Sequence, residues 1–186
     1  MILSILIPST PNRETMLASL ISNLDNQIDK LWLWDEVEIL VEMDSYEKTI
    51  GEKRNALLDK VDSKYLCFID SDDRVAENYL QQLMLGIMLD FDCCSLNGVI
   101  TTNGSNPRTF IHSLKYNSWF EENNIYYRPP NHLNCIKSET AKQFKFPQTN
   151  TGEDKDWSMQ IAESGLLKTE YEITETIYFY DYISNK

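Results

Sequence analysis

Positive charge is scarce in this 186-residue chain, which has 17 lysine and arginine residues against 29 aspartate and glutamate residues and a net charge of −12. A nucleic-acid groove neutralises phosphates with basic side chains, so this balance argues against one. Cysteine is also scarce: four are present, and none forms a Cys-x-x-Cys pair typical of zinc sites. We therefore expect reduced thiols and a cytoplasmic protein.

Long hydrophobic runs are missing, because no stretch approaches the roughly 18 apolar residues of a membrane span. The apolar residues 2–7 make too short a run for a signal sequence, and they lack a basic flank. With 42% hydrophobic residues, the chain can still bury a sizeable core. We expect one domain over residues 1–186.

Up to about residue 90, short apolar runs alternate with amphipathic stretches. The expected strands and helices follow one another at 2–7, 15–27, 37–43, 51–61, 65–69 and 76–89. This βαβαβα order predicts an α/β fold with a parallel, doubly wound sheet.

The pattern changes in residues 91–186, where we expect a smaller mixed half. Residues 117–131 read as irregular and aromatic-rich, long enough to act as a lid. The other elements predicted here are strands at 94–101 and 109–114, short helices at 138–144 and 154–164, and a β segment at 171–180.

Three carboxylates, Asp70, Asp72 and Asp73, follow the third predicted strand directly. Acids this close repel one another unless a cation lies among them, and a hard divalent ion prefers such oxygen ligands. A solvated acidic turn is the simpler alternative. The carboxyl ends of buried parallel strands often border a ligand crevice, which favours the metal site.

Several segments, in their order and spacing, resemble the family 2 glycosyltransferases, whose fold is called GT-A. The matching segments are the opening strand and loop at 4–13, Asn26 and Gln27, residues 51–55, the D-x-D-like residues 68–73, and the Glu-Asp segment at 152–157. The resemblance implies a GT-A fold, with a nucleotide-binding half to about residue 90 and an acceptor-side half after it. It also implies metal-dependent transfer of a sugar, with inversion, from a nucleoside-diphosphate sugar to an acceptor hydroxyl. By analogy, we expect a UDP-sugar and either a glycan or another hydroxyl acceptor.

The resemblance assigns a divalent metal, Mn²⁺ or Mg²⁺, to Asp72, with Asp70 and Asp73 assisting directly or through water, and the metal would stabilise the departing diphosphate. Many family members have a histidine in the last strand as a third ligand, whereas this chain has none there; Asp181 or water are the alternatives. The residues expected at the nucleotide-sugar are Pro8, Thr10, Arg13, Glu42, Asp44, Arg54, Asn55 and Ser71.

Asp154, with Glu153 beside it, is similar to the family's catalytic base, which accepts the proton of the acceptor hydroxyl. His132 and Trp157 are weaker candidates for contact with the acceptor or the sugar. The alternatives are first-turn helix acids for Glu153 and Asp154, and a structural role for His132.

Simpler explanations also exist for two donor-site residues. Arg54 could form a surface ion pair with Asp59 or Asp62, and Glu42 could be an exposed acid. A different function is also open, namely a non-catalytic sugar-nucleotide or glycan-binding domain of the same fold. A nucleotidyltransferase is disfavoured because the loop at 8–13 contains no glycine.

Overall fold

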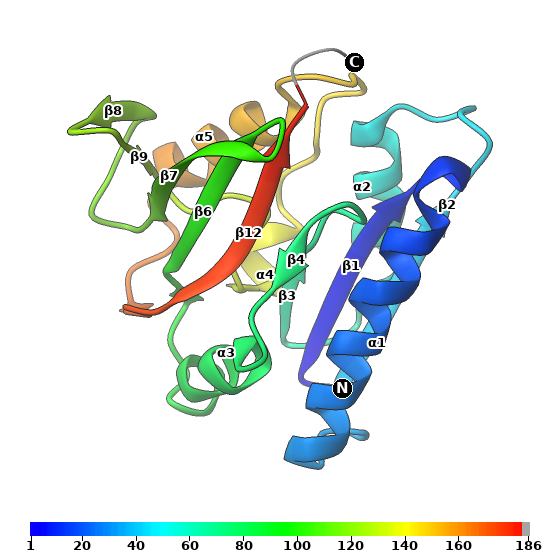
Figure 1. Ribbon diagram of the computed structural model, residues 1–186. Coiled ribbons are helices and arrows are strands. Elements are labelled where there is room, and N and C mark those ends of the chain that lie inside the picture. Colours follow the sequence, from blue (N-terminus) through cyan, green and yellow to red (C-terminus); the bar gives the residue numbers. More distant parts are fainter. Residues whose placement is uncertain (184–186) are drawn as a thin grey trace.

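Alternating strands and helices build the first half of the computed structural model, which describes residues 1–183 (Figure 1). Its elements are β1 (Leu3–Ser9), the 3-10 turn η1 (Pro11–Arg13), α1 (Glu14–Leu31), β2 (Val37–Met43), α2 (Ile50–Lys60), β3 (Tyr65–Phe68), β4 (Arg74–Val75) and α3 (Tyr79–Met88). Strand β1 lies between β2 and β3 and is parallel to both. The predicted alternation and its parallel core are confirmed.

The second half adds mostly short strands. Its elements are β5 (Cys93–Cys94), β6 (Leu96–Thr102), β7 (Ser105–His112), β8 (Phe120–Glu122), β9 (Ile125–Arg128), β10 (Ile136–Lys137), α4 (Ser138–Ala141), α5 (Glu153–Ser164), β11 (Glu170–Tyr171) and β12 (Thr176–Tyr182). One six-stranded sheet has the order β11-β5-β10-β3-β1-β2, and the other has the order β4-β12-β6-β7-β9-β8. The molecule is therefore mixed α/β, as predicted.

The structure differs from the sequence-based expectations in the second half. The segment 117–131 is not irregular, because it contains the antiparallel pair β8–β9, and β9 also pairs with β7. Asn123 and Asn124 form its turn with φ values of 51° and 64°, the left-handed conformation that tight hairpin turns need. The helix expected at 138–144 ends at Ala141, and the β segment expected at 171–180 divides between β11 and β12.

Two clusters of buried apolar side chains cover the two faces of the first sheet. Ile5 and Cys67 belong to the cluster that includes α1 and α3, whereas Leu6 and Phe68 belong to the cluster that includes α2 and α5. Successive side chains of a strand point to opposite faces, so β1 and β3 contribute to both clusters. This packing fixes the carboxyl ends of β1 and β3, where the polar loops begin.

A buried glutamine ties α1 to the segment that follows the acidic motif. The side chain of Gln27 donates to the carbonyl oxygen of Ala76 at 2.9 Å and accepts from the backbone N–H of Leu80 at 2.9 Å. Helices α1 and α3 are thereby held together behind the sheet. Among residues 1–183, no helix combines the length and the apolar character needed to cross a bilayer.

Candidate functional site

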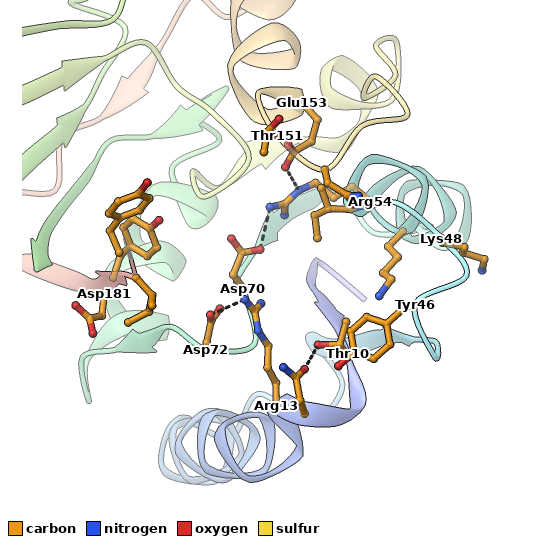
Figure 2. A pocket seen from close by; sticks show the side chains of 17 residues that line it. Thr10, Arg13, Tyr46, Lys48, Arg54, Asp70, Asp72, Thr151, Glu153 and Asp181 are labelled. Atoms are coloured by element: carbon orange, nitrogen blue, oxygen red, sulfur yellow. Dashed lines mark hydrogen bonds and ion pairs between the residues drawn. The ribbon is translucent and has the colours of Figure 1, made fainter. Parts of the chain in front are cut away.

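A cavity of about 610 Å³ opens where β1, β2 and β3 end (Figure 2). Ligands of open α/β sheets bind at this edge, beyond the carboxyl ends of the parallel strands. The connections after these strands supply much of its wall, and α2, the start of α5 and the end of β12 supply the rest. The residues that line the cavity include Thr10, Arg13, Tyr46, Lys48, Arg54, Asp70, Asp72, Thr151, Glu153 and Tyr180.

Two arginines neutralise the acids of this cavity. The Nη2 atom of Arg13 lies 2.7 Å from Oδ2 of Asp72, and Nη2 of Arg54 lies 2.9 Å from Oδ1 of Asp70 (Figure 2). Nε of Arg54 also approaches Oε1 of Glu153 at 3.4 Å. Arg54 thus joins β3 to α5 through two carboxylates, and the surface ion pair considered for it is wrong.

The guanidinium of Arg54 is held in the protein interior. Its side chain is only 3% exposed, and its Cζ lies 5.4 Å from the ring centre of Phe68 and 5.8 Å from that of Phe146. Burial opposes its charge, but the carboxylates of Asp70 and Glu153 outweigh burial and raise the pKa of Arg54. Its Nη1 atom is buried and has no acceptor within residues 1–183.

Asp70 is the most strongly stabilised anion of the motif. Burial opposes its ionisation, but the charge of Arg54, together with the nearby imidazole of His132, holds the pKa of Asp70 well below its usual range. Nε2 of His132 lies 3.8 Å from Oδ2 of Asp70, and His132 is only 4% exposed. His132 therefore lies beside the acidic motif, while its predicted contact with a sugar stays a prediction.

Asp73 has a different environment from its neighbours. It is 4% exposed, and the hydroxyl of Tyr178 donates to its Oδ2 at 2.7 Å. Burial and the negative charge of Asp70 raise the pKa of Asp73 well above its usual range. Asp73 is not part of the cavity wall, and its assistance to a metal, directly or through water, stays a prediction.

The remaining acids suit one mode of divalent-metal binding. Among residues 1–183, no group of three or more histidine, cysteine, aspartate or glutamate side chains is arranged to hold a metal ion. Asp70 and Asp72 nevertheless present carboxylates to the cavity, and Mg²⁺ is commonly held by one or two carboxylates together with substrate phosphates. The side chain of Asp181 accepts from Thr101 at 2.6 Å and from the N–H of Gly104 at 2.9 Å. Its role as a substitute ligand stays a prediction.

The acids after β2 are already paired with lysines. Glu42 is bound by Lys48 and, at 2.6 Å, by Lys60, and these two hydrogen bonds lower its pKa. Asp44 is bound by the buried Lys53. Glu42 lies on β2, the edge strand of its sheet, and neither acid is part of the cavity wall, so their contacts with a nucleotide stay predictions.

Three other predicted donor contacts also lie away from the cavity wall. Pro8 and Ser71 are buried. The amide of Asn55 donates to the carbonyl of Phe146 at 2.8 Å and accepts from its N–H at 2.9 Å, which anchors the segment before α5. Direct contact of these three residues with a ligand in the cavity would require the structure to rearrange.

The two acids at the start of α5 differ in what surrounds them. Glu153 is 5% exposed and is paired with Arg54. Asp154 is half-buried and has no hydrogen-bond or ion-pair partner in the described part of the chain, although its charge acts on Arg54 and Arg128. Glu153 is part of the cavity wall whereas Asp154 is not, so the role of Asp154 as the base stays a prediction.

Trp157 does not face the cavity. Its side chain is 0% exposed and stacks on Phe146, with ring centres 4.7 Å apart and an angle of 10° between the planes. The expectation of a sugar contact is wrong for this geometry, because the indole belongs to the core beneath α5.

Sequence reasoning missed several cavity residues. Tyr46 and Lys48 come from the loop before α2, and Tyr180 comes from β12. The one sequence signal for Tyr46 and Lys48 is their position shortly after β2, a strand that ends at the cavity. Tyr180 gave no signal, because its place depends on the parallel pairing of β12 with β6.

Known proteins share this architecture at low sequence identity. No protein-family model matches the sequence, and no curated protein matches it. A solved structure of TarS 1–349 from S. aureus aligns with a TM-score of 0.64 and 15% identity, covering 97% of this chain and 60% of that one. The chain shares the fold of TarS.

Two ligand complexes of the same protein align equally well. TarS 1–349 with UDP-GlcNAc has a TM-score of 0.65 and 15% identity over 100% of this chain, and the complex with UDP has a TM-score of 0.64 and 15% identity over 97%. In both cases this chain spans about 60% of the TarS 1–349 chain. At this identity the likeness establishes the fold, and membership of family 2 stays a prediction.

Proposed function

We propose that this protein transfers a sugar from a nucleoside-diphosphate sugar, preferentially a UDP-sugar, to an acceptor hydroxyl with inversion. The observation that carries the proposal is one cavity in which the ion pairs Arg13–Asp72 and Arg54–Asp70 lie beside the start of α5. The complexes of the structural neighbour TarS with UDP-GlcNAc and UDP support the choice of donor.

The donor's diphosphate would lie against Arg13 and Lys48. Both face the cavity, and an arginine fork suits phosphate oxygens. Tyr46 is 63% exposed at the same cavity and offers an aromatic face for the nucleobase. Arg54, with its unpaired Nη1, would add a buried positive charge behind the phosphates.

A divalent metal, Mn²⁺ or Mg²⁺, would be held by Asp70 and Asp72. When bound, it would supply charge neutralisation for the diphosphate that leaves. Arg13 and Arg54 keep these two carboxylates ionised and oriented, so the acids are ready as oxygen ligands.

The acceptor oxygen attacks the anomeric carbon, the bond from that carbon to the diphosphate oxygen breaks, and the hydroxyl proton must leave the acceptor. Asp154 would take that proton, because its carboxylate is not engaged by a cation within hydrogen-bond reach. Glu153 is less suited, since Arg54 stabilises its charge. Attack from the side opposite the leaving group gives inversion.

A donor screen tests the proposal. We expect the protein to release UDP slowly from a UDP-sugar such as UDP-GlcNAc in Mn²⁺ or Mg²⁺, and to stop when EDTA is added. Asp72→Asn should lose the metal-dependent part of UDP binding, measured by calorimetry. UDP affinity that is identical in Mn²⁺ and in EDTA would contradict the metal assignment.

Replacing the base should separate binding from turnover. Asp154→Asn removes a proton acceptor and no donor contact, so it should keep UDP affinity and lower the transfer rate by about 10²–10⁴-fold. Glu153→Gln is the matched control, with a smaller effect on rate and a larger one on stability. Donor binding without any turnover in the unmodified protein would favour the non-catalytic binding domain instead.

A further inference from the structure

Arg128, the last residue of β9, has a guanidinium that lies against aromatic rings and has no hydrogen-bonded acid within residues 1–183. Its Cζ lies 4.0 Å from the ring centre of Trp119 and 5.8 Å from that of Tyr126. The side chain is half-buried, and no residue among 1–183 gives it a hydrogen bond or an ion pair. Its hydrogen-bond donors therefore remain available to a ligand.

Three other arginines of the protein have acidic partners, which the half-buried Arg128 lacks in the described part of the chain. Arg13 and Arg54 pair with the acids of the cavity, and Arg108 pairs with Glu121. A partly buried charge without a hydrogen-bonded counter-ion is unfavourable, and it is unexpected in a chain whose net charge is −12. The burial that lowers the pKa of Arg128 also strengthens its attraction for any anion that reaches it.

A second unsatisfied donor lies at the same place. The indole Nε1 of Trp119 is buried and has no acceptor among the described residues, while its ring stacks on the guanidinium of Arg128. Buried N–H groups are nearly always paired, so this indole N–H without an acceptor, next to an arginine side chain without a hydrogen-bond partner in the described residues, indicates a missing acceptor group.

The position of Arg128 places this missing group beside the proposed base. The hydroxyl of Ser158 in α5 donates to the carbonyl of Pro130 at 3.0 Å, so the segment that follows β9 lies against that helix. Asp154 is one turn before Ser158 and therefore on the same helix face. The negative charge of Asp154 acts on Arg128, as does Tyr180 from the wall of the donor cavity.

We infer that Arg128 binds an oxyanion of the acceptor, a phosphate or carboxylate group carried near the hydroxyl that receives the sugar. The inference rests on the proposed function for the identity of the bound molecule as an acceptor. The stacked rings hold the guanidinium plane, which then presents its N–H edge to two oxygens of one anion. An acceptor anchored there brings its hydroxyl toward Asp154.

The test uses small acceptor-like probes and the fluorescence of Trp119. Glycerol 3-phosphate and glycerate are titrated at low ionic strength into protein saturated with UDP, with glycerol as the neutral control. UDP keeps the anions from the donor site. Comparison with Trp119→Phe isolates the emission of Trp119 from that of the other tryptophans, and calorimetry checks the affinities.

We expect saturable binding of at least one of the two anions and none of glycerol. Arg128→Gln should weaken that binding tenfold or more, and Arg128→Lys should weaken it less, because the charge remains while the planar fork is lost. Arg74→Gln is the matched control, since Arg74 is an exposed arginine near the ring of Phe179, and it should bind the anion as the parent protein does.

Absence of anion binding, or equal affinity in the parent and in both Arg128 variants, would overturn the inference. Failure of UDP itself to bind would count against the proposed function instead. In that case, titration of glycerol 3-phosphate without UDP still reports on Arg128, through the comparison with Arg128→Gln and Arg74→Gln.

Discussion

Replacement of Arg54 tests how the two acids behind the cavity are held. The residue is 2% exposed and bridges Asp70, at 2.9 Å, and Glu153, at 3.4 Å. Arg54→Met keeps much of the apolar stem in contact with Phe68 and leaves Glu153 buried without its cation. Breaking a buried ion pair from one side costs about 3–5 kcal/mol, so we expect the free energy of unfolding at pH 7 to fall by about that amount.

A double variant separates the charge from the packing. Arg54→Met combined with Glu153→Gln has no unpaired charge at position 153, so the two substitutions should be less harmful together than their sum. The expected coupling is about 1–3 kcal/mol, because the two side chains are in direct contact. Arg54→Met with Lys155→Met is the matched control, since Lys155 is exposed on α5 and its replacement should add independently.

The loss should also depend on pH. Although burial opposes it, the charge of Arg54 helps to hold the pKa of Asp70 below its unfolded value of about 3.9. This contribution to stability is present above about pH 4 and is lost as the pH falls further. The difference in the free energy of unfolding between the parent protein and Arg54→Met should therefore become smaller below about pH 4.

Urea unfolding at pH 7 and at pH 3.5, followed by circular dichroism, measures both effects. A destabilisation below about 1 kcal/mol at pH 7, the size typical of a solvent-exposed ion pair, would refute the assignment of Arg54 as a buried bridge. Full additivity with Glu153→Gln would refute the pairing itself.

Two further predictions concern residues that sequence patterns placed in the cavity. Burial and the charge of Asp70 raise the pKa of Asp73, so the parent protein should lose stability as the pH rises above about 4 toward the folded pKa, by at most about 1.4 kcal/mol per pH unit. Asp73→Asn should remove this loss, which urea unfolding at pH 5 and pH 7 measures; an unchanged pH dependence would count against it. Trp157→Ala should lower stability by about 3–5 kcal/mol, because the indole is fully buried. Trp157→Phe should retain UDP affinity in calorimetry. A large loss of affinity in a folded Trp157→Phe protein would indicate that Trp157 contacts the ligand after all.

The parallel core could be predicted because the hydrophobic pattern within each short segment identifies it as a strand or a helix. Each strand is a short apolar run, and a helix with its own apolar stripe follows, so the order of elements and the place of the acids after β3 emerge from periodicity alone. The β8–β9 hairpin was not predicted, because its strands are only 3 and 4 residues long and carry charged or half-buried side chains.

The charge pairs of the site could not be predicted because they join distant parts of the chain. Arg54 meets Asp70 across 16 positions and Glu153 across 99, and only the folded sheet brings them together. The acidic motif shows the same limit at short range, since Asp72 faces the cavity whereas its neighbour Asp73 is buried under Tyr178. Adjacent side chains of the same type can have opposite surroundings, and the sequence alone does not show which of them is buried.

All four cysteines are buried, and they gather in and around the first sheet, at Cys67 in β3, at Cys93 and Cys94 in β5, and at Cys135 just before β10. A thiol reagent can reach them only when that sheet opens. The rate of modification by such a reagent therefore reports the opening free energy of the sheet that carries the acidic motif, without any engineered label. A ligand that binds at the strand ends should slow the labelling of Cys67 in proportion to its occupancy.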